Sequence, residues 1–506
     1  MRKKQAVVIL HGMGEQIPME TLQGFVDAVW VHDSTLIRAE RPDSATGEPR
    51  KINATWSKPD RRNRSYELRR ITTESLDTSG STDFYEFYWA HLMYGTTWEQ
   101  VKAWLFDLLW RWPWHVPGGV LPAWIVLWLI SIAVGLGSLV TLVPLATLRA
   151  CLFDACATQP VASPNLLWSV GLPMLTGLVS LVIGAFVSTF LLKYFGDVAR
   201  YVKADPPNVA RRQEIREKGV ELLETLMGRN DNGNYMGSEY DRIVVVAHSL
   251  GTIIAYDILA HCFARLNTKF PVTSAEAAIA VQPERAALES MIRGAVGLPN
   301  AKGADAPDPV ALDLDEFQRQ QELCRKELNS QGNPWLVSDF ITLGSPLTHA
   351  EFLLAKDKKC LRIAQDQRVF PTCPPSLEFD ASTGLRHFTY KLSGAAPDLE
   401  GTHFRLPHHA AHFAYTRWTN LYSRHFGIVW GDIISGPLSG QFGLMANNAS
   451  VSGIRDIRVL PSKKPGRRWK WPPFFSHTKY WLMKDPAQTE DHIQALRDAL
   501  ALKHGR

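Results

Sequence analysis

The chain has 506 residues, 45% of them hydrophobic and 10% aromatic, a composition typical of a globular protein with a sizeable core. Its net charge of +5 is small and diffuse, and no nucleic-acid-binding motif accompanies it, so nucleic acid is excluded as the expected partner. The six cysteines show neither metal-ligand spacing nor a disulfide framework. With no nucleotide or flavin motif either, the sequence predicts a protein that uses no cofactor and no metal.

The first predicted element is a short buried strand near the start of the chain. The run Ala6–Leu10 is apolar and β-branched, and it ends in the turn formed by His11, Gly12, Met13 and Gly14. It is too short for a secretory signal and lacks a cleavage site of small residues. A His-Gly turn after an early strand is typical of one half of an oxyanion hole, and the Met13 N–H is the expected donor.

The next segments divide into structured and irregular stretches. Residues 21–30 have the periodicity of an amphipathic helix, residues 38–77 are polar and predict a loop or edge structure, and residues 83–90 predict a third strand. Residues 97–114 contain five tryptophans at helical spacing. This segment is interpreted as a helix in a membrane interface, with a packed core helix as the alternative.

Two long stretches without charged residues follow, at residues 116–148 and 155–192. Each exceeds the roughly 20 residues that cross a bilayer, so we expect a transmembrane hairpin with spans near 120–148 and 166–192. Two buried helices of a cap domain are the alternative. Lysine and arginine flank the hairpin on its outer sides, which predicts an integral membrane protein whose sheet-forming domain faces the cytoplasm, at the inner membrane if the source is bacterial.

The strongest local pattern lies in the middle of the chain. A fully apolar strand is predicted over residues 243–246, and a helix begins after residue 251. Between them stand Ala247, His248, Ser249, Leu250 and Gly251. A serine with small residues two positions away on each side, between a buried strand and a helix, is typical of a nucleophile elbow, although its first small residue is Ala rather than Gly. Ser249 is therefore the expected nucleophile, and the Leu250 N–H is the second expected oxyanion donor.

Beyond the elbow, residues 265–335 read as a lid-like insertion with helices expected at 275–293 and 314–328. A further strand at 339–347 ends in Gly-Ser-Pro. We interpret its Ser345 as part of a turn, because Pro346 cannot occupy the interior of the helix that an elbow requires. The three histidines His408, His409 and His412 have no carboxylate or thiolate close in sequence, so packing is favoured over a metal site.

The remaining catalytic residues are predicted by elimination. Asp432 is the only carboxylate between residues 401 and 455, and it follows a predicted strand at a turn. Three histidines come after it: His492 falls in a predicted helix at 489–502 and His504 in the tail, whereas His477 lies in a proline-rich loop. A loop is the usual position of a catalytic base, so His477 is the expected base and Asp432 the expected acid.

These residues resemble an α/β-hydrolase of the serine lipase and esterase group, and more distantly the membrane-bound hydrolases similar to GPI inositol-deacylase. The resemblance is carried by His11-Gly12, residues 247–251, residues 344–346, Asp432 and His477. It implies an α/β fold with a doubly wound, mostly parallel sheet, here interrupted by the hairpin. Residues 1–97 and 201–506 are then expected to form the hydrolase domain, with the interfacial helix and hairpin at 98–200.

The resulting expectation is a membrane-anchored serine hydrolase. It cleaves an ester, by preference of a lipid, through an acyl-enzyme, and its partners are an acyl-ester substrate and the bilayer. The lipid preference comes from the membrane placement and from the basic run at 463–470, which can equally be a solvated loop. A thioesterase, amidase or peptidase, and an inactive hydrolase fold serving as a scaffold, remain the alternatives.

Overall fold

The protein is described by a computed structural model that divides into two compact units, residues 1–92 with 209–506 and residues 93–208. The residues that the structure describes are 4–12, 17–37, 42–43, 45–60, 62–63, 67–76, 80–93, 110–119, 121–122, 124–126, 128–129, 131–133, 198, 201–202, 206–270, 282–391, 404–426, 430–446, 449–461, 475–485 and 489–503.

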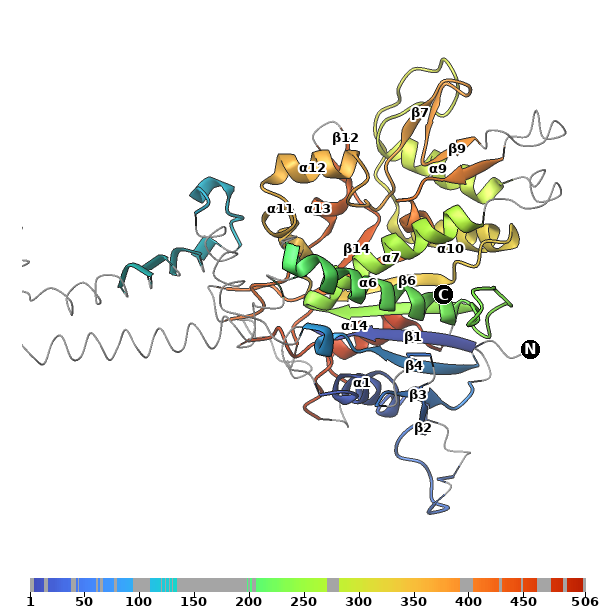
Figure 1. Ribbon diagram of the computed structural model, residues 1–506, viewed down its shortest axis with the longest axis vertical. Coiled ribbons are helices and arrows are strands. Elements are labelled where there is room, and N and C mark those ends of the chain that lie inside the picture. Colours follow the sequence, from blue (N-terminus) through green and yellow to red (C-terminus); the bar gives the residue numbers. More distant parts are fainter. Residues whose placement is uncertain are drawn as a thin grey trace, which may run out of the picture. The chain divides into compact units, whose positions relative to one another are not determined.

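An eight-stranded sheet forms the centre of the first unit (Figure 1). Its strands follow the order β14-β11-β6-β5-β1-β4-β3-β2. The six strands from β14 to β4 run parallel to one another. At the other edge β3 pairs antiparallel with β4, and β2 pairs antiparallel with β3. The bounds are β1 Lys4–Leu10, β2 Thr55–Pro59, β3 Arg69–Thr73, β4 Ser81–Phe87, β5 Arg242–His248, β6 Val337–Leu343, β11 Arg417–Tyr422 and β14 Ile454–Arg458.

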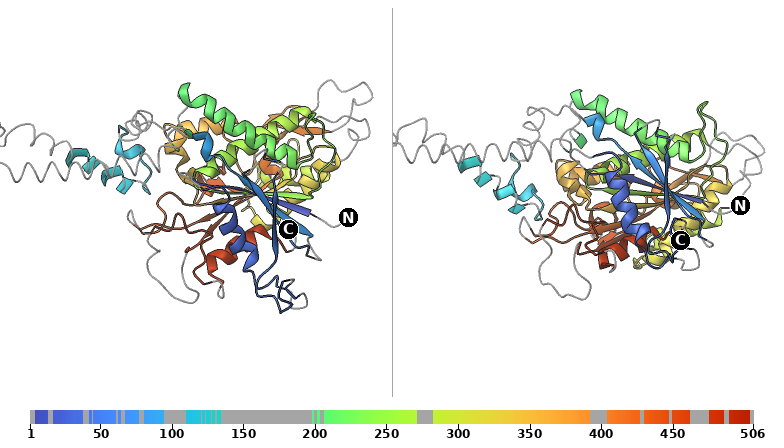
Figure 2. Two further views of the ribbon diagram at one scale, coloured as in Figure 1. Left: turned by 60° about the horizontal axis from the view of Figure 1, so that its bottom comes forward. Right: turned by 90° about the horizontal axis from the view of Figure 1, so that it is seen from below.

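Helices cover both faces of this sheet, as a parallel sheet requires because its strands are apolar on both sides. The left view of Figure 2 shows α6 (Pro206–Leu226) on one side and α1 (Glu20–Val26) with α14 (Asp491–Leu500) on the other. The helix α7 (Leu250–Lys269) packs on β5 and β1. A π-helical turn, Asp27–Val31, continues α1 and contacts α14.

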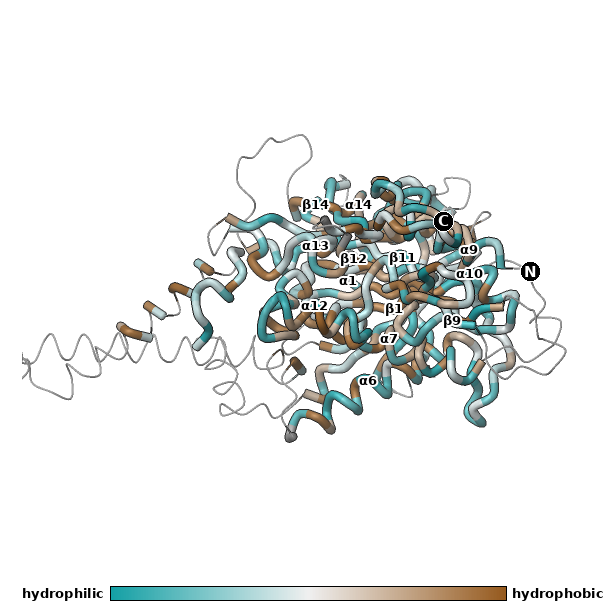
Figure 3. The backbone as a smooth tube through the Cα atoms, turned by 90° about the horizontal axis from the view of Figure 1, so that it is seen from above, coloured by the Kyte–Doolittle hydropathy of each residue, from teal (hydrophilic) through white to brown (hydrophobic). Residues whose placement is uncertain are grey.

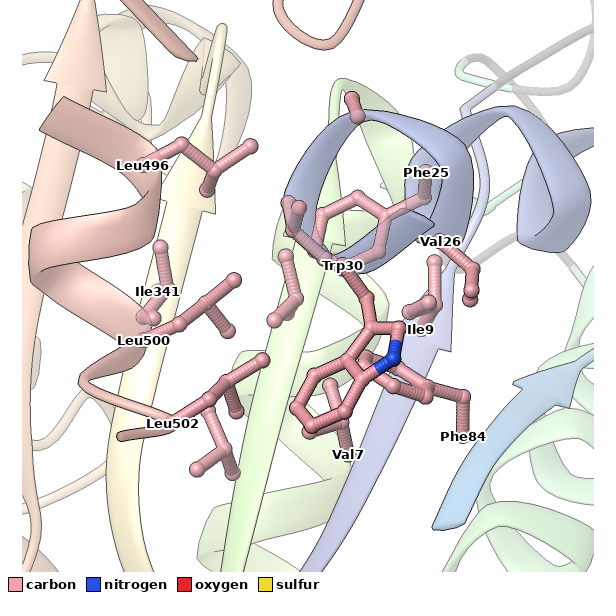
Figure 4. Close-up of a cluster of buried hydrophobic side chains, with 14 of the residues drawn as sticks. Val7, Ile9, Phe25, Val26, Trp30, Phe84, Ile341, Leu496, Leu500 and Leu502 are labelled. Atoms are coloured by element: carbon pink, nitrogen blue, oxygen red, sulfur yellow. The ribbon is translucent and has the colours of Figure 1, made fainter. Parts of the chain in front are cut away.

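The hydrophobic core beneath α1 and α14 holds these helices to the sheet. Figure 4 shows Trp30 among side chains from β1, β4 and α14, including Val7 and Phe84. Trp30 is fully buried, so its indole contributes several kcal/mol of stability, on the order of the 3–5 kcal/mol lost when such a ring is truncated. In Figure 3 the hydrophobic residues gather around the central strands, and hydrophilic residues are more frequent along the outer loops.

Smaller elements surround the end of the sheet that carries β14 and β11 (Figure 1). Glu289 of α9 is buried there and bonds His387 at 2.7 Å, Thr389 at 2.7 Å and Arg285 at 2.7 Å, so its charge is compensated. The smaller elements at this end are α9 Pro283–Ala295, α10 Leu314–Ser330, α11 Ala350–Leu353, α12 Lys358–Asp366, α13 Ser439–Phe442, β7 Glu378–Asp380, β8 Leu385–His387, β9 Thr389–Lys391, β10 Arg405–Pro407, β12 Leu444–Ala446, β13 Ala449–Val451 and the 3₁₀ turns Pro346–His349 and His412–Ala414. Two further 3₁₀ turns lie elsewhere in the chain: Ala90–Met93 follows β4, and Pro113–His115 belongs to the second unit.

The sheet strands that the sequence predicts are present, with bounds shifted by a few residues. The polar stretch 38–77 contains the edge strands β2 and β3, which its lack of periodicity did not reveal. Phe426 and Trp430 pair in an isolated antiparallel bridge. The helix expected at 275–293 begins only at Pro283, and residues 271–281 lie outside the described part of the chain.

The prediction of a transmembrane hairpin has to be corrected. Within the part of the chain that the structure describes, no helix combines the length and apolar character needed to cross a membrane. The expected span 166–192 lies wholly outside the described residues, and so do most of 120–148 and of the tryptophan-rich helix at 97–114. The prediction of an integral membrane protein with two spans is therefore wrong. Absence of charge measures composition alone, whereas a span also requires one continuous helix of about 20 residues.

A buried carboxyl on β4 gives the fold a pH dependence of its own. Glu86 is 1% exposed; its Oε2 accepts the Met19 N–H at 2.7 Å, and its Oε1 has no hydrogen-bond partner among the described residues. Burial raises the pKa of Glu86 from 4.5 to about 7. The folded state therefore keeps this proton at pH values where the unfolded chain has lost it, and stability falls as pH rises from about 4.5 to 7.

We expect Glu86→Gln to remove this penalty. The gain in unfolding free energy over the wild type is expected to be larger at pH 8 than at pH 5, by on the order of 2 kcal/mol. Urea unfolding at the two pH values measures it. Glu20→Gln, on the exposed side of α1, is the control and is expected to show no such difference. An equal effect of Glu86→Gln at both pH values contradicts the expectation.

Candidate active site

The candidate nucleophile lies where β5 ends and α7 begins. β5 stops at His248, α7 starts at Leu250, and Ser249 between them has φ 52° and ψ −128°. A non-glycine residue at positive φ is strained, and such strain persists where the surrounding structure fixes it. Here the Ser249 N–H donates to the Leu343 carbonyl of β6 at 3.0 Å, which anchors the turn to the sheet. The strand, tight turn and helix of the predicted elbow are therefore all present.

The turn is tight because α7 begins directly against the end of β1. A Cβ at Gly251 would lie 2.4 Å from the His11 carbonyl oxygen and 2.8 Å from that of Leu10. Only glycine fits such a close backbone approach. Leu10 is paired with Ala247 in the parallel ladder, so β1 and β5 end at the same edge. This register brings the predicted oxyanion turn beside the nucleophile.

The three residues predicted as a catalytic triad come together in the structure. His477 Nε2 lies 2.8 Å from Ser249 Oγ. His477 Nδ1 lies 2.9 and 3.0 Å from the two carboxylate oxygens of Asp432. An ionised carboxylate only accepts hydrogen bonds, so Nδ1 carries the proton and Nε2 presents a lone pair to the serine hydroxyl. This tautomer is the one that a general base needs.

The charge on Asp432 is held by its surroundings. The residue is 1% exposed, and burial alone would raise the pKa of its carboxyl. His477 and the side chains of Ser435 and Tyr480 outweigh that effect and lower the pKa to about 2. The Ile434 N–H also donates to Oδ1 at 3.0 Å. Asp432 is thus a carboxylate at neutral pH and can stabilise an imidazolium on His477.

The two predicted oxyanion donors have different outcomes. Leu250 is the first residue of α7, where backbone N–H groups have no partner within the helix. Its N–H is therefore available beside Ser249. Met13 and Gly14 lie outside the described residues. Gly12 is described, and a Cβ there would lie 3.0 Å from Ser249 Cβ and 2.9 Å from His248 Nδ1. The His11-Gly12 turn thus borders the nucleophile, as predicted.

Two buried histidines adjoin the site. His11 stacks on Trp89 at 4.9 Å between ring centroids, and the Trp89 Nε1–H donates to the His11 carbonyl at 3.2 Å. Burial lowers the pKa of His11 to about 4 and that of His248 to about 3. Both rings are therefore neutral at physiological pH, and neither adds a positive charge that would oppose protonation of His477.

The other sequence expectations at this edge can also be compared with the structure. Ser345 caps the turn Pro346–His349, where its Oγ accepts the Leu347 N–H at 3.2 Å, so its interpretation as a turn residue is confirmed. The described residues contain no cluster of histidine, cysteine and acidic side chains able to hold a metal ion. His408 and His412 are buried. Ser249 is also buried, with an exposed fraction of only 1%.

Sequence reasoning missed the residues that surround the triad. Tyr480 donates its phenol proton to Asp432 Oδ2 at 2.8 Å, and Gly344 lies under the pair formed by Asp432 and His477. The proximity of Tyr480 to His477 in sequence was a usable signal. The direction in which its hydroxyl points was not, because that depends on the path of the loop.

Comparison of the chain with known proteins identifies no relative. No family model, no curated protein and no solved structure matches the chain. The functional argument therefore depends on the arrangement of the residues themselves.

Proposed function

We propose that the protein is a serine hydrolase that cleaves carboxylic esters through an acyl-enzyme, with a mechanism like that of the α/β-hydrolases. The observation that carries the proposal is the position of His477, which hydrogen-bonds Ser249 Oγ through Nε2 and Asp432 through Nδ1. A serine hydroxyl alone is a weak nucleophile, and a neighbouring base that a third group orients is the feature that activates it.

The proposed reaction has two steps. Ser249 Oγ attacks the ester carbonyl while its proton passes to His477 Nε2, and the carbonyl oxygen becomes an oxyanion held by the Leu250 N–H. The bond to the leaving alcohol then breaks, and His477 returns the proton to that alcohol. In the second step a water molecule gives a proton to His477 and attacks the acyl carbonyl. The bond to Ser249 Oγ then breaks, His477 returns the proton to Oγ, and the carboxylic acid is released.

The proposal is confined to esters without a lipid preference. That preference depended on the membrane placement, which is corrected above, and on the basic run at 463–470, which lies outside the described residues. Esters are chosen over amides because an alcohol is a better leaving group than an amine, so ester cleavage demands less of the proton transfer from His477.

The decisive test is covalent labelling of the full-length protein with a fluorophosphonate. We expect the wild type to be labelled and Ser249→Ala to be unlabelled, since the probe reacts only with an activated serine. Ser345→Ala is the matched control, because Ser345 lies just after β6, the strand next to β5, and is as buried as Ser249; it is expected to keep the label. Equal labelling of the wild type and Ser249→Ala refutes the proposal.

A second measurement separates the reaction classes. Hydrolysis of 4-nitrophenyl esters, an acyl thioester and a 4-nitroanilide is compared at equal enzyme concentration. We expect turnover of the esters and its loss in Ser249→Ala. Turnover of only the thioester or the anilide would favour a thioesterase or amidase, and absence of both turnover and labelling would favour an inactive scaffold.

A further inference from the structure

The acid and the base of the triad pack closely against the backbone of a glycine just after β6. Gly344 has φ +58°, and a Cβ there would lie 3.1 Å from Asp432 Oδ2, 3.2 Å from His477 Nδ1 and 2.7 Å from Tyr480 Cε2. The hydrogen bond between Asp432 and His477 therefore passes directly above the backbone of Gly344. The sheet supports this pair from below, so its lateral position has to be set by other groups.

One such group is the phenol of Tyr480. Tyr480 is fully buried, and its hydroxyl donates to Asp432 Oδ2 at 2.8 Å. The phenol oxygen of Tyr480 in turn accepts the N–H of Ser423, just after β11, at 3.0 Å. Ser435 Oγ also lies 3.0 Å from this phenol oxygen. A single hydroxyl thus joins the turn that carries Asp432, the end of a sheet strand and the loop that carries His477.

The loop of His477 is attached to the same region by a second set of contacts. Ser476 donates its N–H to the Gly431 carbonyl at 3.0 Å and its hydroxyl to Ser423 Oγ at 3.0 Å. Both neighbours of His477 in this network, Ser476 and Tyr480, are buried. The acid and the base are consequently fixed to each other through protein contacts as well as through their own hydrogen bond.

A second group acts from the nucleophile side. His248 Nε2 lies 2.7 Å from the backbone carbonyl oxygen of His477. A carbonyl oxygen only accepts, so Nε2 carries the proton and His248 is the donor. Its other nitrogen faces Gly12 of the oxyanion turn, and the edge of its ring meets Trp481 at 5.0 Å between centroids. The residue before the nucleophile therefore ties the backbone of the base to the nucleophile strand.

We propose that Tyr480 and His248 are positioning residues for the triad, Tyr480 through the carboxylate of Asp432 and His248 through the backbone of His477. This inference rests on the proposed hydrolase function. Neither side chain touches a reacting atom. Tyr480 holds Asp432 in the orientation that fixes the His477 tautomer, and His248 keeps His477 Nε2 within reach of Ser249 Oγ. A geometry held from two sides reduces the reorganisation needed as charge develops on the imidazole.

Tyr480→Phe tests the first contact in the full-length protein. We expect kcat for a 4-nitrophenyl ester to fall by about 10- to 100-fold with KM changed little, because the lost bond orients the triad without binding substrate. The acidic limb of the pH profile of kcat/KM is expected to move to higher pH, since a carboxylate that no longer shares its charge with a phenol holds the imidazolium more tightly.

The matched control is Tyr256→Phe. Tyr256 is also fully buried and also donates one hydrogen bond, to the Pro371 carbonyl at 2.6 Å, outside the triad. It is expected to lose stability comparably while keeping kcat and the pH profile of the wild type. Identical kinetics of Tyr480→Phe and Tyr256→Phe would falsify the role of Tyr480.

The second contact is tested by a pair of substitutions at His248. His248→Leu removes the donor and is expected to lower kcat by about 10-fold or more, again with little change in KM. His248→Gln retains an N–H that can reach the same carbonyl and is expected to recover most of that loss. If the two variants are equally impaired, the donated hydrogen bond is not what matters and this part of the proposal fails.

A spectroscopic measurement keeps the inference separate from the function it rests on. The proton between His477 and Asp432 is expected to give a downfield resonance in the proton NMR spectrum of the whole protein, assigned by its loss in Asp432→Asn. Tyr480→Phe should move this resonance and Tyr256→Phe should not. If the wild type neither hydrolyses esters nor binds the fluorophosphonate, the proposed function fails, and the resonance alone decides the positioning. An unmoved resonance in Tyr480→Phe overturns it.

Discussion

Asp432→Asn is expected to lower kcat for ester hydrolysis by about 10⁴-fold while the protein stays folded, the size of loss seen when the acid of a serine triad is neutralised. In the wild type both carboxylate oxygens accept from His477 Nδ1, at 2.9 and 3.0 Å. An asparagine offers one oxygen and one NH₂ group, and the oxygen is also required by Ile434 or Tyr480. With NH₂ facing Nδ1 the imidazole proton moves to Nε2, and Ser249 faces a donor instead of a base.

Steady-state kinetics and fluorophosphonate labelling rates measure this loss. Asp257→Asn is the control, because Asp257 of α7 is a partly buried carboxylate that forms its ion pair with Arg216 of α6, at 2.5 Å, rather than with His477. It is expected to retain activity. The double variant Ser249→Ala/Asp432→Asn should be no slower than Ser249→Ala alone, since the residues of a triad act as a unit. An Asp432→Asn variant with kcat within tenfold of the wild type would remove Asp432 from the proposed mechanism.

Gly251→Ala is expected to destabilise the protein by about 3 kcal/mol or more and to abolish activity. The added methyl group would lie 2.4 Å from the His11 carbonyl oxygen, and both sides of the contact are backbone, so no side chain can rotate away. Either α7 or the end of β1 has to move. Both carry parts of the proposed site, so loss of stability and loss of activity are coupled.

Gly294→Ala provides the comparison within a helix. Gly294 lies in α9, and an added Cβ would meet no atom within 4 Å. Alanine there is expected to stabilise the protein by about 0.5–1 kcal/mol because of its higher helix propensity. Chemical denaturation of both variants gives the two values. Opposite signs are expected, and a Gly251→Ala protein as stable as the wild type would show that the elbow is less tightly packed than the contacts indicate.

Much of the candidate site could be predicted because its signals are local or depend on order along the chain. Ser249 stands between a strand and a helix whose periodicities are plain in the sequence. Asp432 was identified as the only carboxylate of its window, and His477 as the one later histidine outside a predicted helix and the tail. The structure brings the three together, so the assignment of the triad by elimination agrees with the geometry.

The parts that could not be predicted depend on partners distant in sequence. The strands β2 and β3 are polar because they form the antiparallel edge of the sheet, so they lack the apolar run that marks β1 and β5. The role of Tyr480 depends on where its hydroxyl points. The hairpin prediction failed for a related reason, since an uncharged stretch satisfies a hydropathy criterion whatever structure it adopts.

The wide spacing of the triad has a consequence for the time at which the protein becomes reactive during its synthesis. Ser249 is made 228 residues before His477. A ribosome moving at about 5–20 residues per second needs roughly 10–45 seconds to cover that interval. Throughout it the nascent chain carries a serine without its base, and therefore a hydroxyl with little reactivity. Under the proposed function, hydrolytic capacity arises only after translation has passed β14 and the loop of His477.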